Sequence, residues 1–185
     1  MRIILRLAQF FVVLFLVLAA IGFLLPQEQK VERSIIIRAM PEEVFVHLNG
    51  AKAFNEWSPW ALLDENMLVT YTGPDAGKGS TMAWESEQPG VGSGSLTITD
   101  LMEYEQVDIA LDFGGQGKAA SYFKLQPVAE GTQVTWGFSM DAGMNPIHRW
   151  FGLMMDKWVG SDYEKGLLRL KKLIEGSAAQ LDVPR

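Results

Sequence analysis

The sequence predicts an α+β domain in which a curved antiparallel sheet of about seven strands surrounds one long C-terminal helix, with a single apolar helix preceding the domain. Two observations predict the domain. Short stretches of alternating apolar and polar residues recur between glycine-rich turns, and a long stretch with apolar residues at helical spacing follows the last of them. A third observation, an almost uninterrupted apolar segment at the N-terminus, predicts the preceding helix.

Composition limits the classes of function. A chain of 185 residues is long enough for one domain of ordinary size. Its formal net charge of −6 argues against a nucleic-acid partner. With no cysteine, the chain has no disulfides, thiolate metal sites or cysteine nucleophile, and its two histidines do not suffice for a multi-histidine centre. We therefore expect no metal site and no cofactor, although carboxylate sites for hard cations stay open.

The N-terminal segment is set apart by its hydropathy. Residues 7–25 contain one polar side chain, Gln9, and as a helix they would reach roughly 28 Å. This predicts a transmembrane helix over residues 1–26, joined to the domain by a tether at 27–30. Arg2 and Arg6 precede the span, so the positive-inside rule predicts a cytoplasmic N-terminus and an extracytoplasmic domain, periplasmic in a Gram-negative cell. A cleaved signal peptide is the alternative.

The domain begins with one strand and two short helices. Residues 31–39 alternate as a strand does, and Pro41 with Glu42 and Glu43 then begins a helix, because proline suits the first helical position and carboxylates suit the positive helix end. Residues 49–50, Asn-Gly, end that helix. A second short helix is expected at 51–56.

Six further strands are expected in the middle of the chain. Their connections are too short for crossover helices, so the sheet should be an antiparallel meander with one apolar face. The predicted strands are residues 67–72, 79–86, 93–103, 106–113, 119–127 and 132–141.

The last helix should cover that apolar face. Asn145 is a good N-cap, Pro146 suits the first helical position, and Gly176 follows the expected end of the helix. Apolar residues recur between them at helical spacing. The domain is therefore expected to span residues 31–176, with a flexible tail at 177–185.

Several segments together resemble a known superfamily. They are Trp57-Ser58-Pro59-Trp60, Tyr71-Thr72-Gly73-Pro74, Val91-Gly92-Ser93-Gly94 and the stretches 131–136 and 162–171. With the order of elements, they resemble the polyketide cyclase/dehydrase branch of the START-like SRPBCC proteins, which have the helix-grip fold of the birch-pollen allergen. The resemblance covers roughly residues 31–175. It implies an apolar cavity between sheet and long helix, and it leaves the chemistry open.

The side chains expected to line such a cavity are mostly apolar and bulky, and a packed core made of the same side chains is the alternative. The expected lining is Met82, Trp84, Leu96, Ile98, Ile109, Leu111, Trp136, Phe138, Met154, Met155 and Trp158. Trp57, Trp60 and Asp64 are expected at the cavity mouth, where the two indoles would either gate the cavity or plug the edge of the core.

No residue stands out as a catalyst. His47 and His148 are expected at the boundary of their helices, and Asp108 and Asp112 alternate with the apolar face of their strand and should point to solvent. The leading hypothesis is a membrane-anchored START-like module that binds an apolar small molecule or lipid. A cofactor-independent polyketide cyclase or dehydratase, and a protein-interaction module with a filled core and an unspecified partner, are the alternatives.

Overall fold

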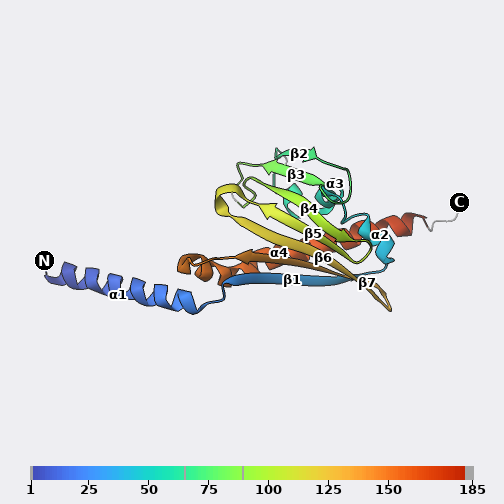
Figure 1. The fold of residues 1–185 in the computed structure, drawn as a ribbon. Helices are drawn as coiled ribbons and strands as arrows, with labels where there is room; N and C mark the ends of the chain where they lie inside the picture. The colour runs from blue at the N-terminus through green and yellow to red at the C-terminus, as the bar shows by residue number, and fades with distance from the viewer. Residues whose placement is uncertain (1, 65, 89, 182–185) are drawn as a thin grey trace.

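The computed structural model describes residues 2–64, 66–88 and 90–181 and shows an α+β fold (Figure 1). Its elements follow in the order α1 (Arg2–Leu24), β1 (Glu28–Ile37), α2 (Pro41–Phe45), α3 (Ala51–Trp57), the 3₁₀ turn η1 (Trp60–Leu62), β2 (Leu68–Thr72), β3 (Thr81–Glu85), β4 (Gly94–Met102), β5 (Gln106–Asp112), the 3₁₀ turn η2 (Gly114–Gln116), β6 (Lys118–Val128), β7 (Gly131–Asp141) and α4 (Pro146–Leu181).

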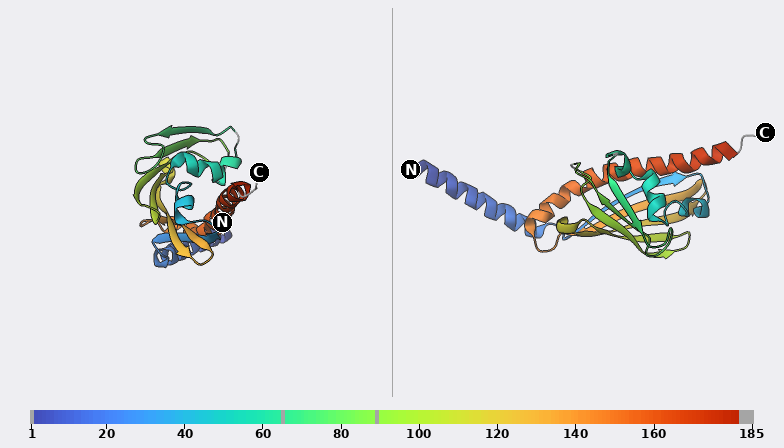
Figure 2. Two further views of the ribbon diagram at one scale, coloured as in Figure 1. Left: turned by 90° about the vertical axis from the view of Figure 1, so that its right-hand side faces the viewer. Right: turned by 90° about the horizontal axis from the view of Figure 1, so that it is seen from above.

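The strands form one seven-stranded antiparallel sheet in the order β1-β7-β6-β5-β4-β3-β2, which confirms the predicted meander. β1 forms one edge of the sheet and pairs with β7, for example Val31 with Phe138. A register shift in β4 between Ile98 and Asp100 marks a bulge, which increases strand bending. Figure 2 shows the sheet curving around an interior that α4 covers.

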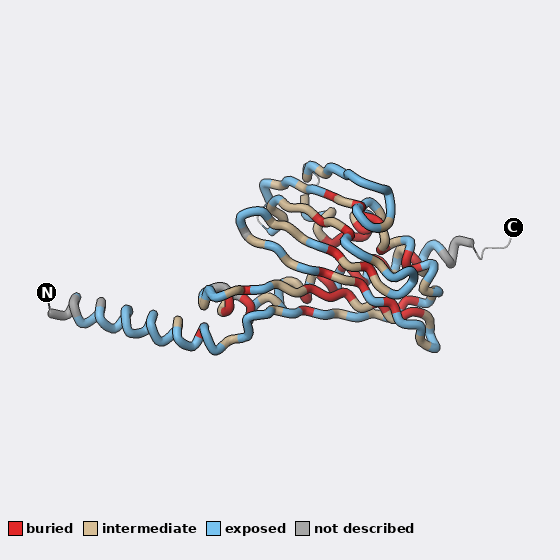
Figure 3. Tube along the Cα trace, in the orientation of Figure 1, coloured by how far each residue is buried: buried red, intermediate tan, exposed pale blue. Residues whose placement is uncertain are grey.

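Helix α4 runs along β1 and fills the interior with one of its faces. Tyr163, Leu167, Leu170 and Ile174 are buried, and they recur at the three- and four-residue spacing of a helix stripe. In Figure 3 the buried residues gather in the sheet, in α2 and α3 with the segments beside them, and in the C-terminal part of α4. The long C-terminal helix and the helix-grip arrangement are thereby confirmed.

Two predicted boundaries differ from the structure. Glu28 already pairs with Asp141, so most of the expected tether at 27–30 is the first part of β1. α4 continues through Gly176, where an added Cβ would meet no other atom within 4 Å, and ends at Leu181. A helix-interior glycine costs only about 1 kcal/mol relative to alanine, which the long helix tolerates. Residues 182–185 of the expected tail lie outside the described residues.

The C-terminal end of α1 forms a joint with the start of α4. The guanidinium of Arg149 is buried and donates to the carbonyl oxygens of Phe23 (2.9 Å), Leu25 (3.2 Å) and Gly143 (2.9 Å). A cation suits the negative end of the α1 dipole. Gly22 packs against Pro146 in the same joint.

The predicted single-pass topology is wrong. Within the described ranges no helix meets the length and apolarity needed to cross a bilayer. This finding overturns the predicted membrane span over residues 1–26 and the extracytoplasmic location inferred from it. The prediction treated residues 7–25 as a helix without contacts to the domain. In the structure the last turn of α1 contacts the start of α4 in this joint.

Candidate functional site

The interior between sheet and α4 has a closed half that aromatic side chains fill. Trp57, Phe123, Trp136 and Tyr163 are each at most 2% exposed. The rings of Trp136 and Tyr163 stack with centroids 3.7 Å apart, and Trp57 meets Trp136 edge to face at 5.3 Å. Such contacts add to the free energy of burying the rings. This half is a packed core.

The two tryptophans that flank Pro59 have different surroundings. Trp57 is buried and its Nε1 donates to the carbonyl oxygen of His47 (2.9 Å), so it belongs to the core. Trp60 is half-buried and lies edge to face on Trp136 (5.9 Å) and Tyr163 (6.3 Å). Trp60 therefore lies at the border between the closed half and the remaining interior.

A small polar network lies inside the closed half. The Ser121 hydroxyl donates to the Gly137 carbonyl (2.8 Å), accepts from Trp136 Nε1 (3.1 Å) and lies 3.3 Å from the Tyr163 hydroxyl. Burial raises the pKa of Tyr163, so its phenol stays neutral. Because these groups are enclosed and bonded to one another, they hold the core together and offer no free acid or base.

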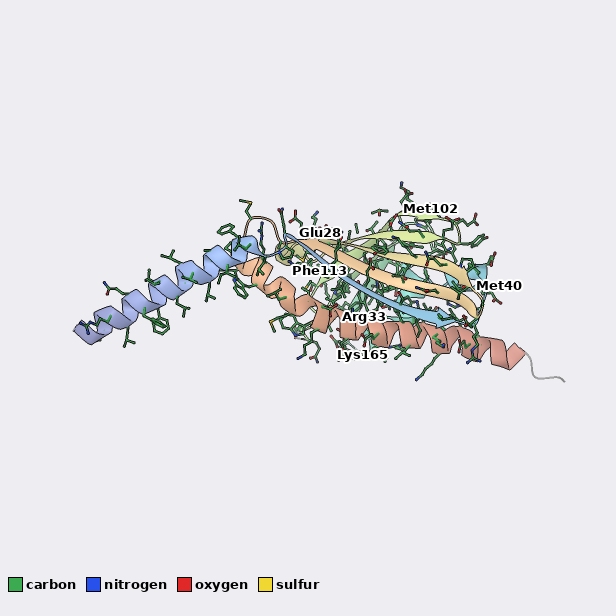
Figure 4. The ribbon with its side chains drawn as sticks, turned by 90° about the horizontal axis from the view of Figure 1, so that it is seen from below. Glu28, Arg33, Met40, Met102, Phe113 and Lys165 are labelled. Atoms are coloured by element: carbon green, nitrogen blue, oxygen red, sulfur yellow. The ribbon has the colours of Figure 1, made fainter. Side chains whose placement is uncertain are left out.

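The other half of the interior is apolar and less completely buried. It lies under the N-terminal part of α4, toward the end of the sheet where α1 leaves; Figure 4 shows Phe113 at this end and Met40 and Met102 at the opposite one. Its side chains are only partly buried and pack against the edge of the core. They are Trp60, Trp84, Leu111, Phe113, Ala119, Met140, Met155 and Val159. We call this set the open half.

The predicted lining residues divide between these regions. Six of them are buried in the core, where they touch neighbouring side chains: Met82, Leu96, Ile98, Ile109, Trp136 and Phe138. Trp84, Leu111 and Met155 belong to the open half. Met154 and Trp158, on the adjacent stripe of α4, are 45% and 49% exposed. Their role as ligand contacts stays a prediction.

Sequence reasoning missed Phe113, Met140 and Val159 as lining residues. Phe113 follows Leu111 at the two-residue spacing of a strand face, Met140 follows Phe138 in the same way, and Val159 is four residues from Met155. Extending the parity of each strand to its end would have found the first two.

Asp64 has a structural function. Its carboxylate accepts from the Ser86 hydroxyl (2.6 Å) and from the backbone N–H of Asn66 (2.9 Å), so it fastens the loop before β2 to the end of β3. Burial lowers the pKa of the half-buried His47, which favours its neutral form. The side chain of His148 lies outside the described residues.

Two shallow hollows lie elsewhere on the surface. One, of about 500 Å³, lies between Pro41, the β4–β5 turn and the end of β6. The other, of about 660 Å³, lies mainly on the convex face of the sheet around Ala110, Ala120 and Ser139. Neither lies between the sheet and α4, so they do not extend the open half.

Comparison with known proteins agrees with this architecture. A family described as "Polyketide cyclase / dehydrase and lipid transport" matches residues 28–175. The chain belongs to this family. The match begins at the first residue of β1 and ends within α4, and it therefore includes both halves of the interior.

Solved structures share the fold at low sequence identity. A Staphylococcus aureus protein, SA2116, has a TM-score of 0.61 at 12% identity, with 82% of this chain and 96% of that one covered. A Rhizobium leguminosarum protein has a TM-score of 0.58 at 13% identity, with 80% of this chain and 95% of that one covered. The Aha1 dimer from Colwellia psychrerythraea has a TM-score of 0.53 at 19% identity, with 79% of this chain and 96% of that one covered. Among curated proteins no sequence matches this chain.

Proposed function

We propose that this protein binds an apolar small molecule or lipid chain in the open half of the interior. The observation that carries the proposal is the contrast between the two halves. The closed half is filled by rings that touch one another, whereas the apolar side chains of the open half pack against the core and remain only partly buried. Soluble domains seldom leave such a group uncovered without a binding partner.

The chemistry of the open half supports a flexible apolar ligand. Met140 and Met155 adapt to irregular shapes, and Trp60 and Trp84 offer flat apolar faces. If a ligand buries on the order of 300 Å² of apolar surface, the gain is about 7 kcal/mol before the entropy of association is subtracted. That magnitude suits a ligand bound and released reversibly. The family description, which includes lipid transport, points the same way.

The charged groups near the interior are already engaged. The guanidinium of Arg33 binds Asp156 (2.9 Å) and Glu164 (2.7 Å) on α4, and Arg149 binds main-chain carbonyls in the α1 joint. Figure 4 shows Arg33 beside α4. Neither arginine is available to a ligand carboxylate, so the site favours apolar contacts over charge recognition.

The test uses the full chain. Lipids extracted from the purified protein are identified by mass spectrometry, and the change in melting temperature is measured with fatty alcohols, fatty acids and sterols. We expect Met155→Gln to weaken binding by about threefold to tenfold, because it places an amide in the apolar wall. Leu168→Gln, on an exposed position of the same helix, is the matched control and should leave binding unchanged. If wild type carries no lipid and no class shifts its melting temperature, the proposal is wrong.

A protein-interaction module is the second candidate. The aromatic filling of the closed half favours it, because much of the expected cavity is occupied by the protein's own side chains. In that case the open half and the exposed Met154 and Trp158 would meet a protein. Binding of a small apolar probe that Met155→Gln weakens and Leu168→Gln does not would favour the ligand site.

A further inference from the structure

A hollow of about 500 Å³ lies where the start of α2 meets the turn between β4 and β5 and the end of β6. Its walls are residues 41–42, 102–106 and 124–127, and we call it the acidic hollow. Figure 4 shows Met102, one of these residues, at the end of the domain opposite α1. The volume lies within the range of about 300–1,000 Å³ that binding clefts span.

The acidic hollow presents exposed apolar side chains. Met102 is 53% exposed and Tyr104 is 39% exposed, and Pro41 and Pro127 complete the apolar part of the wall. Tyr104 is fixed by one contact with the core, because its ring meets the buried Phe45 edge to face at 5.4 Å. The rest of the ring and the adaptable thioether of Met102 remain accessible to a partner.

The backbone at Tyr104 supports a function for this ring. Its φ is +63°, and among the described residues it is the one residue other than glycine with a positive φ. Glycine or asparagine adopts this conformation at a smaller cost in free energy than a bulky side chain does. The position thus keeps an aromatic ring against the preference of its own backbone, which is typical of residues retained for a functional reason.

Three exposed glutamates surround the apolar part: Glu42, Glu103 and Glu105. None of them forms a salt bridge with a side chain in the described part of the chain. The basic residue in the wall, Lys124, places its Nζ 4.8 Å from the centroid of the Tyr122 ring. The acidic hollow therefore has an excess of negative charge around an apolar centre.

The arrangement of these carboxylates indicates what kind of partner fits. A hydrogen bond to Glu103 and the charges of Glu103 and Glu42 raise the pKa of the Tyr104 phenol, so both carboxylates lie close to the ring. Within the described ranges, however, no three acidic or histidine side chains converge as a metal site requires. Separate carboxylates around an apolar centre complement separate cationic side chains, whereas the phosphates of nucleic acids or anionic lipids would be repelled.

We propose that the acidic hollow binds a basic, amphipathic segment of a protein partner. An apolar side chain of that segment packs on Tyr104 and Met102, and flanking lysine or arginine side chains pair with Glu42, Glu103 and Glu105. This interaction is independent of the ligand proposed for the open half, because the acidic hollow lies outside the space between the sheet and α4.

The experiment measures peptide binding to the full-length protein by fluorescence anisotropy. One labelled peptide alternates lysine and leucine, and a second peptide of the same charge has serine in place of leucine. We expect the wild type to prefer the leucine peptide by about fivefold, because one apolar side chain becomes partly buried. Replacing the three glutamates of the acidic hollow with glutamine should weaken binding of the leucine peptide by about tenfold.

The matched control removes the same charge elsewhere. It replaces three exposed glutamates that lie outside the acidic hollow: Glu85→Gln, Glu87→Gln and Glu130→Gln. This control should change the affinity by less than about twofold. If it weakens binding as much as the substitutions in the acidic hollow do, the peptide responds to net charge alone and the proposal is wrong. The proposal also fails if wild type binds neither peptide, or binds the serine peptide as tightly as the leucine peptide.

Two further variants locate the bound peptide. Tyr104→Asn suits the left-handed backbone and removes the ring, so we expect it to weaken binding of the leucine peptide by about fivefold with an unchanged circular dichroism spectrum. An unchanged affinity would show that the ring only covers Phe45 and would overturn the proposal. Met155→Gln, in the open half, should leave peptide affinity unchanged. If it weakens binding as Tyr104→Asn does, the peptide occupies the open half and the acidic hollow is not its site.

Discussion

Replacing Ser121 with alanine should destabilise the closed half far more than the loss of one hydroxyl suggests. Ser121 is 4% exposed, and its oxygen is the hydrogen-bond partner of both Trp136 Nε1 (3.1 Å) and the Tyr163 hydroxyl (3.3 Å). In Ser121→Ala both donors would stay buried, since Trp136 and Tyr163 are each 2% exposed. They would have no partner.

The magnitude follows from the two orphaned groups. A buried donor without a partner costs about 1–3 kcal/mol, so two give a loss of roughly 3 kcal/mol in the free energy of unfolding. With a slope of about 2 kcal/mol per molar urea, the midpoint of unfolding should fall by roughly 1.5 M. The assay is urea unfolding followed by tryptophan fluorescence and by far-ultraviolet circular dichroism.

Ser34→Ala is the matched control. Ser34 lies in the same sheet and its hydroxyl also pairs with a side chain, Thr135 (2.8 Å), but at an exposed position where water replaces the lost partner. Its cost should stay within about 0.5 kcal/mol. If Ser121→Ala costs no more than Ser34→Ala, the two rings do not depend on Ser121 and the description of the closed half as a hydrogen-bonded aromatic core is wrong.

Three further predictions concern α4. Gly166→Ala should lower the melting temperature, because the new Cβ would lie 2.7 Å from the Trp136 ring and 3.1 Å from Pro59. The control Gly176→Ala, where the new Cβ meets no atom within 4 Å, should raise the free energy of unfolding by up to about 1 kcal/mol. Equal effects of the two substitutions would contradict the close packing of Gly166 against Trp136. Arg33 lowers the pKa of Asp156, so the stabilisation from this carboxylate is present above the unfolded pKa near 3.8 and is lost as pH falls through the lower folded value. Unfolding measured from pH 6 to 3 should show this loss in wild type and a smaller one in Arg33→Met, and identical profiles would refute the ion pair. Arg149→Met should increase amide hydrogen exchange in residues 22–29, because it removes the hydrogen bonds to the carbonyl oxygens of Phe23 and Leu25. Exchange around the buried Tyr163 should stay unchanged. Unchanged exchange in residues 22–29 would show that the joint does not depend on Arg149.

Local chemistry was enough to predict most of the fold. Asn145 caps α4 as expected, its side-chain oxygen accepting from the Ile147 N–H (2.9 Å), and Pro41 stands at the first position of α2. Alternation of apolar residues placed the strands, because one face of the sheet is buried. These signals act within a few residues, so one sequence contains them completely.

The site was only partly predictable, because burial depends on how far each element extends over its neighbours. Trp136 and Phe138 on β7 follow the same pattern as Met140, yet the first two are buried and Met140 is half-buried, since it lies nearer the open end. Likewise Met154 and Met155 are adjacent and differ in exposure because the helix turns about 100° between them.

The division of the interior also constrains how a ligand would be held. Because aromatic rings occupy the closed half, a ligand in the open half would have protein on the sheet side and the partly exposed stripe of α4 on the other. Part of its surface would remain in water, and each 100 Å² left exposed forgoes about 2.5 kcal/mol of apolar burial. Affinity would then be limited and release fast, which suits transfer between partners better than storage.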